Sequence, residues 1–140
     1  MRRFAITFQR LAVSGAVAVQ LTLISACSPD ETISGYADRT ATYALVEIDG
    51  VAVSARATIS FPSKGEIVGS GPCNTYRASQ TAPYPWFSPG PIAATRRACP
   101  DLAVEQALLQ RLAAATQAEV AGDVLILTTD AGDMLVFQAE

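Results

Sequence analysis

The sequence predicts an α+β fold, in which one helix packs on an antiparallel sheet, and three observations carry this prediction. Short apolar segments with period-two alternation are separated by turns that contain Gly, Pro or Asp, as in antiparallel strands. One segment, residues 101–117, has leucines at helical spacing instead. Strands lie before and after this segment, and this element order is typical of an α+β domain.

Four strands are predicted before the helix. The first covers residues 43–50, and the second, residues 56–61, alternates apolar and polar side chains cleanly. A PSKG turn, in which Gly65 supplies the positive φ, joins the second strand to the third at residues 66–70. The fourth strand covers residues 74–79 and follows a Gly-rich turn.

The helix is predicted over residues 101–117, with Asp101 at its N-cap position. Three strands follow it and form a terminal antiparallel meander. They are expected near residues 118–120, 124–129 and 134–139, with Gly-Asp turns between them.

The segment at residues 83–91 holds four prolines, which fits an edge or an ordered loop better than a central strand. It carries three aromatic residues, Tyr84, Trp86 and Phe87. Two interpretations are open. These rings either line a surface that binds a partner or ligand, or they belong to the core.

The amino-acid composition excludes several classes of chemistry. The chain contains no histidine, which removes Ser–His and Cys–His nucleophilic sites, imidazole metal sites and histidine acid–base catalysis. Its single lysine, Lys64, lies in a predicted turn. The acids after residue 129 lack the ligand spacing of a calcium loop. We therefore expect no metal and no cofactor.

The chain has few charged residues and is acidic overall, with a formal net charge of -3 at pH 7. Three of its arginines lie within the first ten residues, so the remainder is more negative. Arg96 and Arg97 are adjacent and could bind an anion, but we favour their interpretation as solvated surface side chains. An acidic domain with scattered arginines does not suggest binding to nucleic acid.

The N-terminus has the organisation of a signal peptide. A basic segment at residues 1–10 precedes an apolar segment at residues 11–24, which is too short for a transmembrane helix. The sequence LISAC that follows resembles the lipobox of bacterial lipoproteins. The resemblance implies cleavage before Cys27 and acylation of Cys27, so that the mature protein is anchored to a membrane through its acyl chains. Ser28, in place of aspartate, favours the outer membrane, facing the periplasm.

The N-terminal features divide the chain into three parts. Residues 1–26 are assigned to the signal peptide and residues 27–41 to a flexible tether, because the latter are polar and lack periodicity. Residues 42–140 then form the folded domain.

Two cysteines remain if Cys27 is acylated. In an oxidising periplasm, an even remainder favours a disulfide between Cys73 and Cys99. Two free buried thiols are the alternative. A nucleophilic cysteine would lack a histidine to activate it, and a zinc site would lack ligands.

Glu105 lies in the middle of the leucine stripe of the predicted helix. A carboxylate at such a position must find hydrogen-bond donors, because burying it unpaired costs several kcal/mol. It could serve as a general acid, or it could hold backbone amides near Asn74 or Thr95, or an arginine such as Arg77. We favour the structural role, with Glu105, Asn74 and Thr95 as buried polar residues, because no second carboxylate or nucleophile is evident.

The sequences GPCNTY and ATRRACPDLAVEQALLQRL together resemble the META domain, also called HslJ-like. The positions that match the family's motifs are Cys73, Asn74, Tyr76, Thr95, Ala98, Cys99, Glu105 and Leu112. The resemblance covers about residues 42–139. It implies a curved, nearly barrel-like antiparallel sheet around one helix, and a stress-related envelope protein without enzymatic activity.

These observations together predict a monomeric, non-enzymatic envelope lipoprotein that works by binding an envelope protein or by supporting envelope integrity under stress. Two alternatives remain for its function. The protein could carry a small hydrophobic ligand or lipid inside the curved sheet, or it could escort an outer-membrane protein in the manner of pilot lipoproteins.

Overall fold

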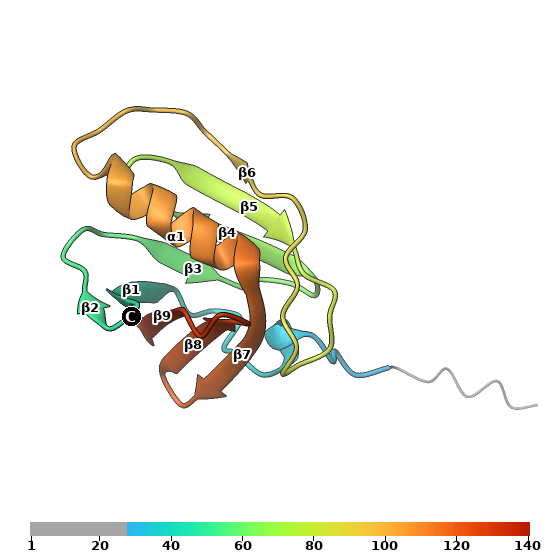
Figure 1. The fold of residues 1–140 in the computed structure, drawn as a ribbon. Helices are drawn as coiled ribbons and strands as arrows, with labels where there is room; N and C mark the ends of the chain where they lie inside the picture. The colour runs from blue at the N-terminus through green and yellow to red at the C-terminus, as the bar shows by residue number, and fades with distance from the viewer. Residues whose placement is uncertain (1–27) are drawn as a thin grey trace, which may run out of the picture.

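The computed structural model describes residues 28–140, so the predicted signal peptide and Cys27 lie outside the described residues. The elements follow the chain in the order shown in Figure 1. They are η1 (Ile33–Gly35), β1 (Tyr43–Ile48), β2 (Val51–Ala52), β3 (Thr58–Ser60), β4 (Glu66–Ser70), β5 (Thr75–Ser79), β6 (Ala93–Ala94), α1 (Leu102–Ala114), β7 (Ala115–Ala121), β8 (Val124–Thr129) and β9 (Met134–Ala139).

All of these strands belong to one antiparallel sheet. The strand order is β6-β5-β4-β3-β1-β9-β8-β7, with β2 paired to β1. The two ends of the domain sequence meet in the middle of the sheet, where β1 pairs with β9 and Leu45 lies opposite Phe137. The sheet curls around α1 as a half-barrel (Figure 1), which confirms the predicted α+β class and the predicted curvature.

The core lies between the inner face of the sheet and α1. Leu108 and Leu112 of the helix are fully buried there. Alternate residues of β8 and β9 turn inward, because successive side chains of a strand point to opposite faces of the sheet. The largest fully buried side chains are Tyr43, Phe61, Phe87, Phe137, Ile33, Ile59, Ile67, Leu108, Leu112, Leu125, Leu127 and Leu135. The inside of the half-barrel is therefore filled by side chains.

The helix is shorter than the sequence predicts. It ends at Ala114, and the backbone of Ala115 is already extended, so residues expected in its last turn belong to β7. Strand β7 pairs with β8 from Ala115 to Ala121, and Ala115 and Ala118 are buried. Pairing across the sheet thus overrides the helical preference of alanine and glutamine. Asp101 occupies the N-cap position, but its side chain makes no capping hydrogen bond.

The first strand is also shorter than predicted, because it ends in a tight turn. Asp49 and Gly50 both have positive φ, at 51° and 81°. This geometry suits a two-residue hairpin loop, and it returns the chain into the short strand β2. The side chain of Asp49 also accepts hydrogen bonds from Arg111 and from the backbone of Met134, so it joins this turn to α1 and β9.

The prediction of a flexible tether over residues 27–41 is wrong from Thr32 on. Thr32, Ile33 and Ser34 of this segment are buried against the domain. The carboxylate of Asp30 organises the turn, since it accepts hydrogen bonds from Thr32, Ser34 and Arg39. These local polar contacts allow a segment of polar composition to fold onto the core.

The Pro-rich segment covers the free edge of β7. The backbone of Phe87 donates to the carbonyl of Thr116 (2.8 Å), and Ala118 donates to the carbonyl of Pro85 (2.8 Å). At its other end, Pro89 forms a bridge with Gln80, just beyond β5. The segment therefore spans the opening between the two arms of the curled sheet and protects an edge that would otherwise be free to pair.

Candidate functional site

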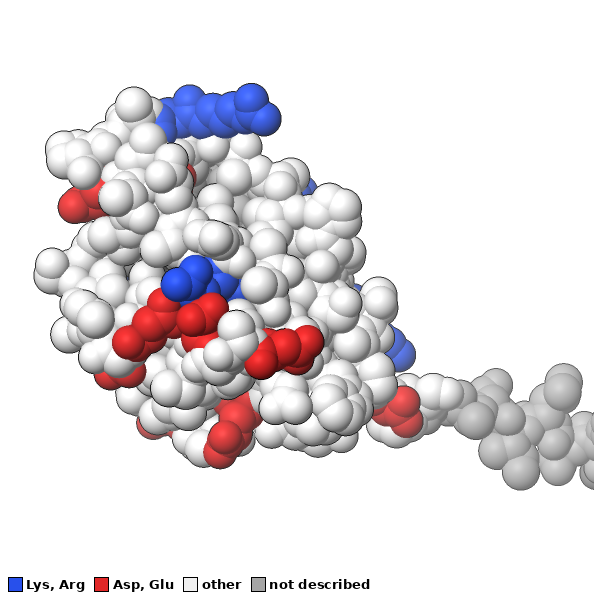
Figure 2. All heavy atoms as spheres, in the orientation of Figure 1, with Lys and Arg blue, Asp and Glu red and all other residues white. Residues whose placement is uncertain are grey.

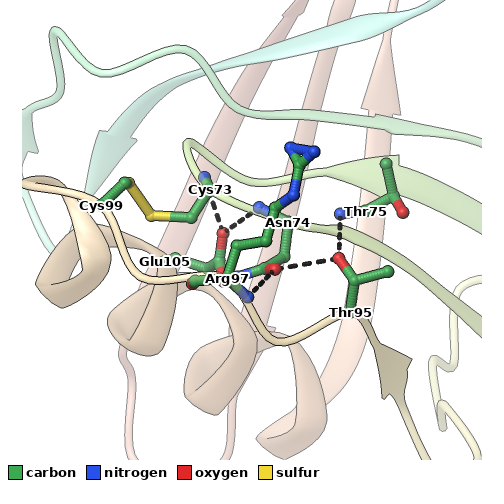
Figure 3. The surroundings of a disulfide bond; sticks show 7 residues. All are labelled: Cys73, Asn74, Thr75, Thr95, Arg97, Cys99 and Glu105. Atoms are coloured by element: carbon green, nitrogen blue, oxygen red, sulfur yellow. Dashed lines mark hydrogen bonds between the residues drawn. A yellow bond between two sulfur atoms is a disulfide. The ribbon is translucent and has the colours of Figure 1, made fainter.

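The cysteines of the two motifs form a disulfide, as predicted. The Cα atoms of Cys73 and Cys99 are 5.7 Å apart, and 26 positions separate them in sequence. The bond joins the turn before β5 to the segment that leads into α1 (Figure 3). It therefore ties the sheet to the start of the helix, and neither sulfur remains as a free thiol.

Glu105 reaches from α1 to the turn before β5 (Figure 3) and is only 4% exposed. Its Oε2 accepts hydrogen bonds from the backbone amides of Cys73 (2.9 Å) and Asn74 (2.8 Å). Its Oε1 accepts a hydrogen bond from the side-chain amide of Asn74. Both carboxylate oxygens are thus engaged by the turn, and no ion pair with Arg77 is present within residues 28–140.

Asn74 connects the turn to the segment after β6. Its Oδ1 accepts hydrogen bonds from the backbone amide of Arg97 (2.6 Å) and from the hydroxyl of Thr95 (2.9 Å). Its Nδ2 also donates to the carbonyl of Arg97 (3.0 Å). We refer below to Asn74, Thr95 and Glu105, with the disulfide beside them, as the anchor cluster. It holds together three segments that are far apart in sequence.

The prediction that all three polar residues are buried is wrong for Thr95. Asn74 and Glu105 are buried, whereas Thr95 is exposed on the edge beside the short strand β6. Its hydroxyl still accepts a hydrogen bond from the backbone of Thr75 (3.2 Å). Thr95 therefore links the edge segment to β5 from the solvent side.

Two glycines near the anchor cluster are needed for close approach, which sequence reasoning missed. A Cβ atom on Gly71 would lie 2.8 Å from Cγ of Glu105 and still closer to its carboxylate. A Cβ on Gly69 would collide with the ring of Tyr76. The Gly-x-Gly sequence before Cys73 was the available signal, because glycine in a strand often marks a place where another group comes close.

Tyr76, the tyrosine of the GPCNTY sequence, lies on the inner face of β5. Its hydroxyl donates a hydrogen bond to the carbonyl of Thr58 on β3 (2.8 Å). Burial raises the pKa of Tyr76 well above its ordinary value. The phenol therefore stays protonated and serves as a buried donor across the sheet.

An open hollow of about 460 Å³ lies beside the anchor cluster, between α1 and residues 92–98. Ile92, Leu102 and Leu109 form its apolar side, and Arg96 and Arg97 lie at its rim. The guanidinium of Arg97 points away from the carboxylate of Glu105 (Figure 3). Every donor directed at Glu105 comes from the protein's own turn, which is the arrangement of a structural anchor rather than of a general acid aimed at a substrate.

The surface of the domain shows no concentration of positive charge on the face drawn in Figure 2. White atoms dominate this face, and acidic side chains gather in its lower half. Within residues 28–140, no group of three or more acidic, cysteine or histidine side chains is placed to hold a metal ion. No helix in the same range has the length and apolar character needed to cross a membrane.

The structure separates the three aromatic residues of the Pro-rich segment. Trp86 is 56% exposed and Tyr84 is half-buried, whereas Phe87 is 1% exposed. The ring of Phe87 packs edge-on against Phe61 in the core, with the ring centroids 6.4 Å apart. The hypothesis that Phe87 belongs to a partner surface is therefore wrong, because its side chain points to the inside while its backbone pairs with β7.

A fourth aromatic residue lies against this segment. Tyr36, just after η1, stacks on Tyr84 with ring centroids 4.2 Å apart, and it is 54% exposed. Sequence reasoning missed this residue because the surrounding segment was expected to be flexible. The exposed rings of Tyr36 and Trp86 and the half-buried ring of Tyr84 are together called the aromatic face below.

Comparisons with known proteins support the resemblance seen in the motifs. Two solved structures share the fold: an NMR structure at 21% identity (TM-score 0.59, covering 71% of this chain and 89% of the other), and one from Burkholderia xenovorans at 25% identity (TM-score 0.56, covering 80% and 83%). No curated protein sequence matches the chain. The family model of the META domain matches residues 37–140. The match begins before β1 and runs through the whole sheet and the anchor cluster, so this chain belongs to the META domain family.

Proposed function

We propose that this protein is a non-enzymatic lipoprotein of the cell envelope, anchored by acyl chains on Cys27, which acts by binding an envelope component under stress. The observation that carries the proposal is the anchor cluster. The most reactive side chains near the cluster are those of Cys73, Cys99 and Glu105. The two cysteines form a disulfide, and Glu105 accepts hydrogen bonds from the turn before β5. This arrangement supports a role in building a stable binding domain rather than in catalysis.

The disulfide and the lipobox support the same compartment. A disulfide persists in oxidising surroundings such as the periplasm, and the proposed signal peptide that ends in LISAC would direct the chain across the inner membrane to that compartment. A domain stabilised by a disulfide suits a protein that must remain folded outside the cytoplasm. We further propose the outer membrane, on its periplasmic side, as the place of anchoring.

The interior of the sheet argues against the alternative of a hydrophobic-ligand carrier. Leu108 and Leu112 of α1 fill the space that such a ligand would need, and they pack with fully buried residues of β8 and β9. A binding function would therefore use the outer surface of the domain. Escort of an outer-membrane protein remains compatible with such a surface.

Fractionation of the envelope tests the proposed anchoring. The wild-type protein should sediment with membranes and require detergent for release, whereas Cys27→Ser should remain unprocessed or appear in the soluble fraction. The matched control is the double variant Cys73→Ser/Cys99→Ser, which loses two cysteines but keeps the lipobox, and it should still sediment with membranes. Release of the wild-type protein without detergent, or processing of Cys27→Ser to a membrane-bound form like that of the wild type, would contradict the proposal.

A further inference from the structure

We propose that the aromatic face, formed by Tyr36, Tyr84 and Trp86, lies against the membrane surface and sets the orientation of the domain on it. This inference rests on the proposed acylation of Cys27 and adds a partner for the exposed rings, namely the headgroup region of the lipid layer. It differs from the usual picture of a domain that moves freely on a long tether.

The chain between the proposed anchor and the domain is short. Thr32 and Ile33 are buried, so the domain begins five residues after Cys27. Five extended residues span at most about 17 Å. The surface of the domain around Thr32 must therefore stay within this distance of the lipid to which Cys27 is attached.

The aromatic face adjoins the same chain segment around Thr32. The backbone amide of Tyr84 donates a hydrogen bond to the carbonyl of Glu31 (2.7 Å). Tyr36, four residues after Thr32, stacks on the ring of Tyr84. The residues that leave the membrane thus bring Tyr36 and Tyr84 to the membrane side of the domain, and Trp86 follows two positions after Tyr84 in the same segment.

The rings and the segment that supports them suit the boundary between water and lipid. Tyrosine and tryptophan favour the boundary between water and lipid, because their rings are apolar and their N–H or O–H group is polar. Trp86 lies between Pro85 and the buried Phe87, and the segment is held by hydrogen bonds to β7. A rigid support reduces the entropy lost on contact with lipid.

The charges beside the aromatic face favour a contact that does not depend on anionic lipid. Arg39 pairs with Asp30 at 2.6 Å, and the exposed neighbours Glu31 and Asp38 are acidic. No excess of positive charge is therefore available to attract anionic headgroups. We expect the orientation to form on zwitterionic lipid and to persist at high salt.

Trp86 is the single tryptophan of the chain and reports on its own position. The mature acylated protein is reconstituted into phosphatidylcholine vesicles, with and without lipids brominated in the acyl chain. Trp86 emission should shift to shorter wavelength on reconstitution, lose most of its intensity in brominated vesicles and become protected from aqueous iodide. The same result is expected at low and high salt.

The matched control moves the tryptophan to the other end of the domain. In the double variant Trp86→Phe/Val51→Trp, the new ring replaces Val51 of β2, which is 67% exposed. Strand β2 lies on the left of Figure 1, whereas the blue segment at the start of the described residues lies on the lower right. Its emission should stay that of a water-exposed ring, open to iodide and unaffected by brominated lipid.

The outcomes separate this inference from the proposed function. If intact mass shows no acyl chains, the anchoring is wrong and the orientation falls with it. If the protein is acylated and bound to vesicles but Trp86 remains open to iodide and insensitive to brominated lipid, only the orientation is overturned. Protection of Trp86 in native envelopes but not in pure lipid vesicles would assign the aromatic face to a protein partner and would also overturn it.

Discussion

Replacing Glu105 with alanine should destabilise the fold strongly, although the residue carries out no chemistry in this account. The substitution removes the acceptor of three hydrogen bonds, which come from the backbone of Cys73 and from the backbone and side chain of Asn74. These donors lie in the turn that meets α1. Glu105→Ala would leave them without a protein partner at the place where the sheet and the helix are joined.

The expected cost follows from the number of donors and from their access to water. Hydrogen bonds to a charged group contribute about 1.5–3 kcal/mol each to stability. Glu105 borders the open hollow beside α1, so water can enter and satisfy part of the loss. We therefore expect Glu105→Ala to lower the free energy of unfolding by about 2–4 kcal/mol. For a domain of this size, that corresponds to a fall of roughly 10–20 °C in Tm.

Denaturant unfolding of the oxidised protein measures this cost. A substitution at Gly71 adds a sharper test of where the carboxylate lies. Gly71→Ala alone should destabilise the fold, because its new Cβ meets the carboxylate of Glu105. In the double variant Gly71→Ala/Glu105→Ala the carboxylate is absent, so the new Cβ has nothing to collide with. The loss in free energy of unfolding should therefore be smaller than the sum of the losses in the two single variants. The control is Gln106→Ala, an exposed neighbour on the same helix, whose effect should stay within about 0.5 kcal/mol.

Two results would refute this reasoning. If Glu105→Ala unfolds at the same denaturant concentration as Gln106→Ala, the carboxylate does not hold the turn. If the losses from Gly71→Ala and Glu105→Ala simply add, the two groups are not in contact as the structure places them.

The remaining predictions concern the disulfide, an ion pair and the Pro-rich segment. Cys99→Ser should lower the free energy of unfolding by roughly 3 kcal/mol in the chain-entropy model, measured by urea unfolding. As a control, the reduced wild type should be about as stable as Cys99→Ser. The hydrogen bond from Arg111 lowers the pKa of Asp49, so Asp49→Asn should cost stability at pH 7. The difference should begin to shrink as pH falls below about 4, the ordinary pKa of aspartate, and should vanish only below the lowered pKa of the folded protein; a difference that grows in acid would contradict this. Phe87→Ala should cost about 3–5 kcal/mol, whereas Trp86→Ala should leave Tm nearly unchanged in a melting curve; equal losses would show that Trp86 is also core.

The sequence predicts those parts of the fold in which local pattern and tertiary packing agree. Apolar runs separated by Gly-Asp turns place residues 124–129 and 134–139 in strands, and both are strands of the sheet. The leucine stripe places Glu105 among buried positions of the helix, where the structure has it at 4% exposure. In the helix, the spacing of apolar residues decides which side faces the core.

Other features depend on contacts that no local pattern encodes. Residues 115–117 have helical propensity, and only pairing with β8 turns them into a strand. The turn around Asp30 is polar in composition, and its fixed place follows from a few side-chain hydrogen bonds and from the burial of Ile33. In the Pro-rich segment, the irregular backbone has no period, so the opposite directions of Trp86 and Phe87 could not be derived from spacing.

The attachment of acyl chains to Cys27 is the central claim about function, and intact-mass spectrometry of the mature protein from native envelopes tests it most directly. The account predicts a chain that begins at Cys27, carries the added mass of two or three acyl chains with their glycerol unit, and contains one intact disulfide. Mature protein that begins at another residue, or that begins at Cys27 with a free amino group and an unmodified thiol, would contradict it.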